Sequence, residues 1–385
     1  MKISQKEFAP FFSVQQIDTE HFLGTAPSVF VGRYNYPYLN VGILAPPEVL
    51  EGAELYDAPR EWSARNFQIR DVLQFRSTLI NSRFQTNIKA KPKLLEITQE
   101  VAMASKPTEV EFFLDKKPVY KLETTGVETV IGAHAGLKKA ILTENSRIDR
   151  RVDAVVSDTD FKAADALSHL YQKGYDETFL ARLLSVGVLG VNFQRKIVPT
   201  RWSITAVDDT LGKMMIDEVK QYSSCDYQFA FGGYLGNYFL VLFFPRVWSF
   251  ELFEMSISAL QKGDVNFTRD YELYEGRKGY ATECVGGYYA ARLGILETFD
   301  GLKRQGAVLV LRFITDDYTA PLGVWVVREA TRRALQQRTT CSSEAEMLKQ
   351  AQQLVLAHFK VDIESLLSQS KVLEHIKTQK TLKDF

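Results

Sequence analysis

The stretch SVFVGRYNYPYLNVGILAPPEV, residues 28–49, encodes β-structure early in the chain. Its apolar and β-branched residues predict two short strands, one around Phe30 and one over residues 41–44. The tight segment 32–37 separates these strands, and the proline pair at 46–47 ends the second. We therefore expect this part of the chain to form sheet rather than helix.

Helix and strand patterns follow each other irregularly along the rest of the chain. Helices are predicted at residues 63–84, 92–105, 161–172, 177–184, 287–299, 322–337, 343–359 and 361–369. Strands are predicted at residues 109–114, 119–122, 152–156, 202–207, 228–231, 238–244, 247–253 and 307–314. Because this order lacks a strict βαβ alternation, the expected fold class is α+β, with mixed sheets and packed helices.

The length of 385 residues exceeds what one hydrophobic core usually serves, so a two-part body is expected. The polar stretch 261–270 is the best candidate boundary. We therefore place an N-terminal domain at residues 1–265 and a C-terminal domain at residues 266–370. Residues 371–385 are mainly polar and basic, and they are predicted to form a flexible tail.

Charge and cysteine content exclude several classes of protein. Lysine plus arginine number 47 and aspartate plus glutamate also number 47, which excludes a generally basic protein that coats nucleic acid. Three cysteines without CxxC spacing exclude a zinc ribbon and disfavour a disulfide framework, and no resident metal or cofactor is predicted. Since no signal peptide or membrane-spanning stretch is visible, we expect a cytoplasmic protein with no membrane partner.

Two arginines attract attention in the helix predicted over residues 63–84. At about 100° per residue, Arg76 and Arg83 fall within the apolar face rather than on the polar side. An arginine keeps its charge when buried, so each needs an anionic partner. Two interpretations stay open: a buried ion pair with an aspartate of the chain, or a cleft in which both arginines bind phosphate.

Residues 60–93 carry a local excess of positive charge. Eight basic residues stand against two acidic ones, an excess of six: Arg60, Arg65, Arg70, Arg76, Arg83, Lys89, Lys91 and Lys93 against Glu61 and Asp71. In a chain of zero net charge this stretch is the best electrostatic footprint for a phosphate backbone, although a solvated surface without a ligand is an equal alternative. Arg33 and Arg201 complete the candidates for binding phosphate or DNA.

Pairs of aspartates follow two of the predicted strands: Asp158 and Asp160 the first, Asp208 and Asp209 the second. Carboxylates at strand ends can hold a divalent metal for phosphodiester chemistry, which makes these four residues the catalytic candidates. The alternatives are a helix cap for the first pair and a turn for the second.

The last seven residues, QKTLKDF, contain the most informative motif. Gln379, Leu382 and Phe385 are spaced i, i+3 and i+6, on one side of a short 3₁₀ turn. This QxxLxxF spacing resembles the PIP motif that docks onto the sliding clamp PCNA. There the aliphatic and aromatic residues fill a hydrophobic pocket, and the glutamine hydrogen-bonds beside it. A frayed helix end is the alternative.

Long segments of the chain also resemble the archaeal Nre family of DNA-repair proteins. The resemblance lies in SVFVGRYNYPYLNVG (28–42), the spacing of Asp57, Pro59 and Trp62, VPTRWSITAVDD (198–209), GGYYAARLGILE (286–297) and PLGVWVVREATRRAL (321–335). It implies a role in the response to DNA damage, exercised with the clamp through the terminal motif, and no established catalytic reaction. Some relatives carry an N-terminal cysteine cluster that this chain lacks, so a zinc role is not transferred.

These observations favour a DNA-repair protein that PCNA recruits through Gln379, Leu382 and Phe385. The alternative is a metal-dependent enzyme that processes nucleotides or DNA at the four aspartates, with arginines nearby. A purely structural interaction protein is the third possibility. Whether the chain is an enzyme stays open, because that depends on whether Arg33, Arg201 and the aspartates converge.

Overall fold

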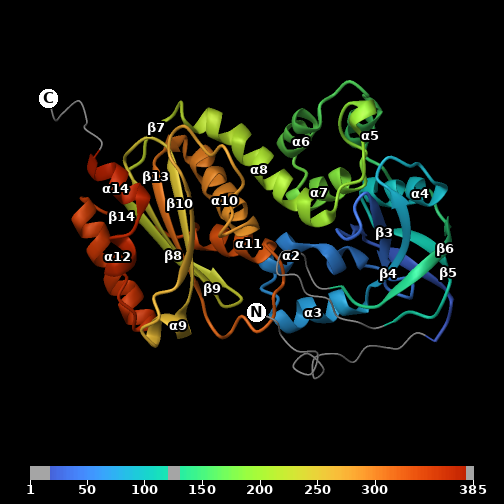
Figure 1. Ribbon diagram of the computed structural model, residues 1–385, viewed down its shortest axis with the longest axis horizontal. Coiled ribbons are helices and arrows are strands. Elements are labelled where there is room, and N and C mark those ends of the chain that lie inside the picture. Colours follow the sequence, from blue (N-terminus) through green and yellow to red (C-terminus); the bar gives the residue numbers. More distant parts are fainter. Residues whose placement is uncertain (1–17, 120–130, 379–385) are drawn as a thin grey trace. The chain divides into compact units, whose positions relative to one another are not determined.

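The computed structural model describes residues 18–119 and 131–378, and the chain divides into two compact units (Figure 1). The first unit ends at Leu211 and also includes Ala320–Gly323, and the second comprises the remainder. Each unit combines helices with a six-stranded sheet. The α+β fold class and the two-part body are therefore confirmed.

The units divide at a different place from the predicted boundary at 265/266. That boundary lies inside the second unit, between the paired strands β10 (Ser249–Ser256) and β11 (Phe267–Glu272). The observed division falls within α8 (Thr200–Val219). The polar stretch 261–270 thus connects two strands of one sheet.

The sheet of the first unit has the order β1-β5-β6-β4-β3-β2. Its strands are β1 (His21–Ala26), β2 (Ser28–Val31), β3 (Tyr38–Ala45), β4 (Ile80–Asn87), β5 (Thr108–Leu114) and β6 (His134–Leu142). Only the β4–β6 pair is parallel; the other neighbours are antiparallel. Since residues 41–45 are all buried, β3 lies in the core, as its apolar sequence predicts.

Helices of the first unit follow from local capping signals. They are η2 (Ala53–Asp57), α2 (Pro59–Ala64), α3 (Ile69–Thr78), α4 (Lys93–Met103), α5 (Arg150–Ser157), α6 (Ala163–Gln172), α7 (Glu177–Ser185), η3 (Asn192–Gln194) and the start of α8. Pro59 occupies the first turn of α2, and the Asp176 carboxylate accepts the Phe179 N–H at the start of α7 (2.8 Å).

The predicted helix 63–84 is wrong, because two backbone breaks interrupt it. Asn66, just after α2, has a φ of 57°, in the left-handed region. After α3 the chain turns extended at Leu79, and β4 pairs with β3 and β6. Arg83 therefore lies on a strand, not on a helix with Arg76.

The strands predicted at 152–156 and 202–207 are also wrong, since both segments are helical, in α5 and α8. A short apolar run does not by itself distinguish a buried strand from a helix. Here local signals favour the helix: Asp149 caps α5 by accepting the Arg151 N–H (2.9 Å), and the Pro199 carbonyl accepts the Ser203 N–H at the start of α8 (3.0 Å).

The main sheet of the second unit has the order β11-β10-β13-β9-β8-β14. Besides β10 and β11, its strands are β8 (Gln228–Tyr234), β9 (Asn237–Phe244), β13 (Ala307–Ile314) and β14 (Arg338–Thr340); β7 (Ser223–Ser224) and β12 (Arg304–Gln305) form a separate pair. In the main sheet β10 and β13 are parallel, and the other neighbours are antiparallel.

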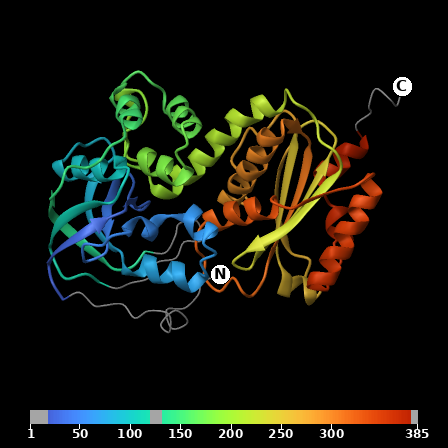
Figure 2. The same cartoon turned by 180° about the vertical axis from the view of Figure 1, so that it is seen from behind.

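Helices cover both faces of this sheet, as Figures 1 and 2 show from opposite sides. They are α9 (Ile257–Gln261), α10 (Gly286–Leu302), α11 (Trp325–Ala334), α12 (Glu344–Phe359), α13 (Glu364–Leu367) and α14 (Lys371–Thr378). One face carries α10 and α11. On the other face, apolar residues of α12, α13 and α14 share a core with β9, β10 and β13.

The prediction of a flexible tail from residue 371 is wrong for residues 371–378, which form α14. Val372, Leu373 and Ile376 are all buried on the sheet, in the amphipathic spacing of a packed helix. Residues 379–385 lie outside the described part of the chain. Within residues 18–119 and 131–378, no helix is long and apolar enough to cross a membrane.

A buried ion pair joins β11 to α10. Arg292 donates to Glu272 (2.8 Å), whose other carboxylate oxygen accepts the Trp248 indole N–H (3.2 Å). All three side chains are buried. Charged groups in such a place are stable only together, because desolvating either one alone costs several kcal/mol.

Glu272→Ala should therefore lower the free energy of unfolding by roughly 3 kcal/mol or more, since it leaves Arg292 and the Trp248 N–H without this carboxylate. Urea unfolding followed by far-UV circular dichroism measures the loss. Glu275→Ala, at an exposed position three residues away, is the matched control and should change little. Equal unfolding midpoints for the two variants would contradict the assigned role.

Candidate functional site

The structure places Arg76 in a buried ion pair. Its Nη1 donates to Asp57 Oδ1 (2.7 Å) and to the Tyr56 carbonyl (3.1 Å), and only 3% of the residue is exposed. Burial lowers the pKa of the Arg76 guanidinium, and Asp57 opposes that shift. This geometry agrees with the ion-pair interpretation of Arg76.

Arg83 lies elsewhere, on β4, where it is opposite Gly42 of β3. It is only partly buried. Because Arg76 and Arg83 do not share a helix face, the helix periodicity that suggested a common cleft no longer supports it.

The four aspartates do not lie at strand ends. Asp158 follows α5. Its Oδ1 accepts the N–H groups of Asp160 (3.0 Å) and Phe161 (3.1 Å), and these bonds close a turn. Asp208 and Asp209 lie inside α8, and both have interaction partners. Throughout residues 18–119 and 131–378, no group of three or more His, Cys, Asp or Glu side chains is placed to hold a metal ion.

The three cysteines are buried and free. Burial raises the pKa of the Cys225 thiol to about 12, and it also raises the pKa values of Cys284 and Cys341. All three are therefore thiols rather than thiolates at neutral pH, and they are poor nucleophiles.

A cavity of about 300 Å³ opens in the first unit, beside the Arg76–Asp57 pair. Its lining includes Asp57, Pro59, Arg60, Lys106, Asp176 and Arg182. Arg60 pairs with Glu177 (2.5 Å), and Arg182 donates to the carbonyls of Pro27 (2.5 Å) and Ala104 (3.2 Å). Both guanidinium groups are thus bonded to the protein's own oxygens, while the buried Nε of Arg182 has no acceptor among residues 18–119 and 131–378.

Arg33 and Arg201 belong to segments that the structure brings together. The Val31 N–H donates to Thr200 Oγ1 (2.9 Å), which joins the end of β2 to the start of α8. The rings of Tyr36 and Trp202 lie 5.8 Å apart across the same junction. Arg33, Tyr34, Tyr36, Arg201 and Trp202 form what we call the tyrosine–tryptophan surface.

The sequence predicted the two arginines of this surface as phosphate-binding candidates, but not its aromatic residues. The signal was present in GRYNYPY (32–38) and TRW (200–202), where basic and aromatic residues are interleaved. Their meeting could not be foreseen, because it depends on α8 packing beside β2.

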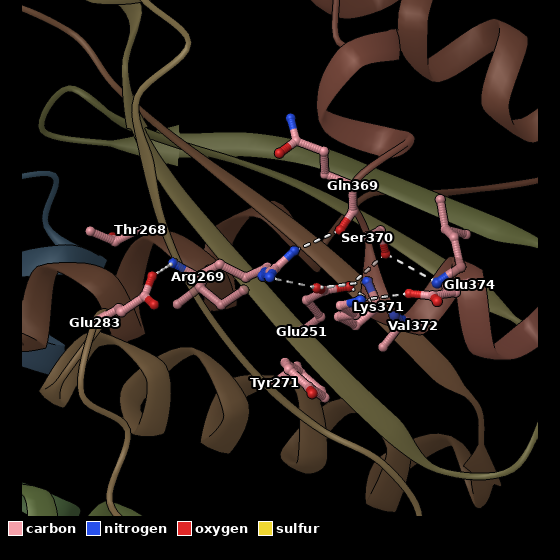
Figure 3. Close-up of polar contacts among 12 residues, drawn as sticks. Glu251, Thr268, Arg269, Tyr271, Glu283, Gln369, Ser370, Lys371, Val372 and Glu374 are labelled. Carbon is pink, nitrogen blue, oxygen red and sulfur yellow. Dashed lines mark hydrogen bonds and ion pairs between the residues drawn. The ribbon is translucent and has the colours of Figure 1, made fainter.

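The second feature of functional interest is the attachment of α14 (Figure 3). Glu251 of β10 is fully buried, and its Oε2 accepts from Ser370 Oγ (2.5 Å) and the Val372 N–H (3.0 Å). Its Oε1 accepts the Lys371 N–H (3.0 Å) and lies 3.7 Å from Arg269 Nε. A carboxylate from the sheet thus satisfies the first amides of the helix and complements its positive end.

Further bonds hold this α14 anchor, which consists of Glu251, Arg269, Ser370 and the first amides of α14. Arg269 Nη1 donates to the Gln369 carbonyl (2.6 Å), and Ser370 Oγ accepts the Leu373 N–H (3.1 Å). Burial raises the pKa of Glu251, while the bonds from Ser370, Val372 and Lys371 oppose the shift. The anchor fixes α14, whose described residues reach Thr378, one position before Gln379 in the sequence. Gln379, Leu382 and Phe385 themselves lie outside the described residues.

Two family models match the chain: Archaeal Nre, N-terminal, over residues 5–259, and Archaeal Nre, C-terminal, over residues 272–385. The chain belongs to the archaeal Nre family. It is 36% identical over 367 residues to DNA repair protein NreA of Haloferax volcanii, which covers 92% of the chain and 87% of the relative. It is 34% identical over 376 residues to DNA repair protein NreB of Archaeoglobus fulgidus, covering 96% and 93%. No solved structure matches the chain.

The Nre resemblance noted in the sequence is thereby confirmed, and the structure locates its segments. Residues 28–42 and 198–209 contribute the tyrosine–tryptophan surface, and Asp57 and Pro59 line the cavity. Residues 286–297 lie in α10, and residues 321–335 contain α11.

Glu251→Ala should loosen α14 selectively. Three donors lose their buried acceptor, and hydrogen bonds to a charged group contribute roughly 2 kcal/mol each. We expect amide exchange in α14 to accelerate about 30-fold or more, measured by hydrogen–deuterium exchange with mass spectrometry. Glu374→Ala is the matched control on the same helix, since it removes only the exposed pair with Lys371. Identical exchange in both variants would refute the anchor.

Proposed function

We propose that the chain is a DNA-repair protein that the sliding clamp PCNA recruits through Gln379, Leu382 and Phe385. Its membership of the Nre family supports the repair role, because its relatives are named DNA repair proteins. The QxxLxxF spacing supports the clamp as partner.

The observation that carries this proposal is the position of the motif relative to α14. The apolar residues of α14 are already buried against the sheet, and the last of them is Ile376. The next apolar residues in the sequence are Leu382 and Phe385. The part of α14 that Glu251 anchors therefore leads in sequence directly into the residues that would enter the clamp.

The expected affinity suits recruitment rather than permanent assembly. Burying Leu382 and Phe385 contributes roughly 1.5–3 kcal/mol each, and ordering the motif on the clamp subtracts from that sum. With the added hydrogen bonds we expect a Kd near about 1 μM, equivalent to about −8 kcal/mol. Because the clamp repeats its binding site, other partners can occupy it at the same time.

The alternative hypothesis of a metal-dependent enzyme assumed that the four aspartates lie at strand ends, and the structure does not bear out that assumption. Asp158 and Asp160 form a turn after α5, and Asp208 and Asp209 belong to α8. The four carboxylates therefore do not share the strand-end arrangement on which that hypothesis was based.

Phe385→Ala in the full chain should weaken clamp binding by about 2 kcal/mol or more, roughly 30-fold, because an aromatic anchor loses its desolvated pocket. Isothermal titration calorimetry of the full chain against PCNA measures the change. Lys380→Ala is the matched control, since Lys380 occupies a variable position of the QxxLxxF spacing and is expected to stay outside the pocket. If the wild type and Phe385→Ala bind equally well, the motif is accidental and the recruitment proposal fails.

A further inference from the structure

We propose that the tyrosine–tryptophan surface binds single-stranded DNA, by stacking bases on its rings and pairing phosphates with the cations around them. The inference rests on the proposed DNA-repair function only for the choice of DNA over RNA. The binding chemistry itself follows from the surface.

The surface is built on a rigid frame of three chain segments. The Ile88 N–H donates to the Pro37 carbonyl (3.0 Å), and the Ile197 N–H donates to the Ile88 carbonyl (3.0 Å). Together with the bond from Val31 to Thr200, these contacts tie the β2–β3 turn to the end of β4 and to the start of α8. The aromatic rings therefore need no folding step to reach one another.

Each segment points its apolar residues inward and keeps aromatic or basic ones exposed. Val31, Leu39, Ile88 and Ile197 belong to one buried cluster. On the same segments Tyr34, Tyr36 and Trp202 are 61%, 48% and 48% exposed. Large aromatic residues gathered outside a completed core mark an interaction site rather than a packing need.

The charge of the three segments selects an anionic partner. Residues 31–40, 87–93 and 192–202 contain seven basic residues and no acidic one: Arg33, Lys89, Lys91, Lys93, Arg195, Lys196 and Arg201. In a chain whose net charge is zero, this is a local field suited to a phosphate backbone. Of these seven, Arg195 already forms hydrogen bonds within the protein, because it donates to the carbonyls of Gly190 (2.7 Å) and Asp158 (2.9 Å).

Arg33 shows a donor that the described residues leave unused. Its guanidinium lies 4.9 Å from the centre of the Tyr34 ring, and its Nη2 donates to the Tyr34 hydroxyl (3.0 Å). Its Nε is buried, and residues 18–119 and 131–378 offer it no hydrogen-bond acceptor. A phosphate cannot reach this enclosed atom, so what Arg33 offers a ligand is its positive charge, held beside the Tyr34 ring.

Single-stranded DNA fits these features better than duplex DNA or an acidic protein. Exposed rings can stack on unpaired bases, whereas bases in a duplex are already stacked on each other. An acidic peptide would satisfy the cations but has no flat faces for Tyr36 and Trp202. Stacking is tolerant of sequence, so binding should depend little on which bases are present.

Trp202 provides a direct readout. The chain has four tryptophans, and Trp62, Trp248 and Trp325 are buried, which leaves Trp202 as the exposed one. We expect single-stranded DNA to quench its emission. The binding test itself uses the full chain and a fluorescein-labelled oligothymidylate of about 20 nucleotides, followed by anisotropy at about 50 mM salt.

The double variant Tyr36→Ala/Trp202→Ala should weaken this binding at least about tenfold, because two stacking faces are lost. The matched control is Tyr274→Ala/Tyr280→Ala, two exposed tyrosines of the second unit, which should bind like the wild type. Circular dichroism checks that both variants fold. Lys89→Gln/Lys196→Gln should lower the slope of log K against log salt by about 1.4, since each phosphate contact contributes about 0.7.

Three results would overturn the proposal: no binding by the wild type, equal binding by the aromatic double variant and its control, or tighter binding to duplex than to single strands. An RNA oligomer of the same length bound at least about tenfold tighter would overturn the choice of DNA. Calorimetry of the double variant against PCNA separates this proposal from the recruitment proposal, because clamp binding should stay unchanged. If the wild type binds single-stranded DNA but shows no binding to PCNA, only the recruitment proposal is refuted.

Discussion

Glu251 places a carboxylate in the interior of the second unit, at a depth where an unpartnered charge would be strongly destabilising. The first turn of α14 supplies the partners, from residues about 120 positions later in the chain. The carboxylate needs these donors, and the helix amides need an acceptor. Sheet and helix therefore complete each other, so the order of this unit extends to Thr378. The residues proposed to bind the clamp follow this anchored helix in the sequence.

Much of the fold was predictable, because strong local patterns agreed with tertiary packing. The strand 307–314 matches β13 residue for residue, and 343–359 differs from α12 only at its first residue. The wrong predictions concern segments in which the local sequence pattern and the tertiary packing favour different structures. Leu79 and Ile80 continue the apolar spacing of α3, yet pairing with β3 and β6 converts this stretch into a strand. Residues 202–207 are rich in β-branched side chains that favour a strand, but they lie in α8.

The functional residues were less predictable, because they depend on contacts between distant segments. A buried ion pair was one of two interpretations of Arg76 drawn from its charge on an apolar face, and Asp57 could not be named from the sequence. The role of Glu251 could not be predicted, since a single acidic residue in an apolar strand does not indicate which groups will donate hydrogen bonds to it. Likewise, Tyr36 and Trp202 are 166 positions apart, and only the packing of α8 beside β2 brings their rings together. Sequence patterns therefore identified the segments that carry candidate residues, whereas the contacts between those segments became known only from the fold.

The central claim is that the folded body extends through α14 and that the clamp engages only the residues after it. Hydrogen–deuterium exchange of the full chain, with and without PCNA, tests this directly. The account predicts that amides of residues 371–378 are protected in both states, and that protection of residues 379–385 rises when the clamp is added. Rapid exchange of residues 371–378 without the clamp, or unchanged exchange of residues 379–385 with it, would contradict the account.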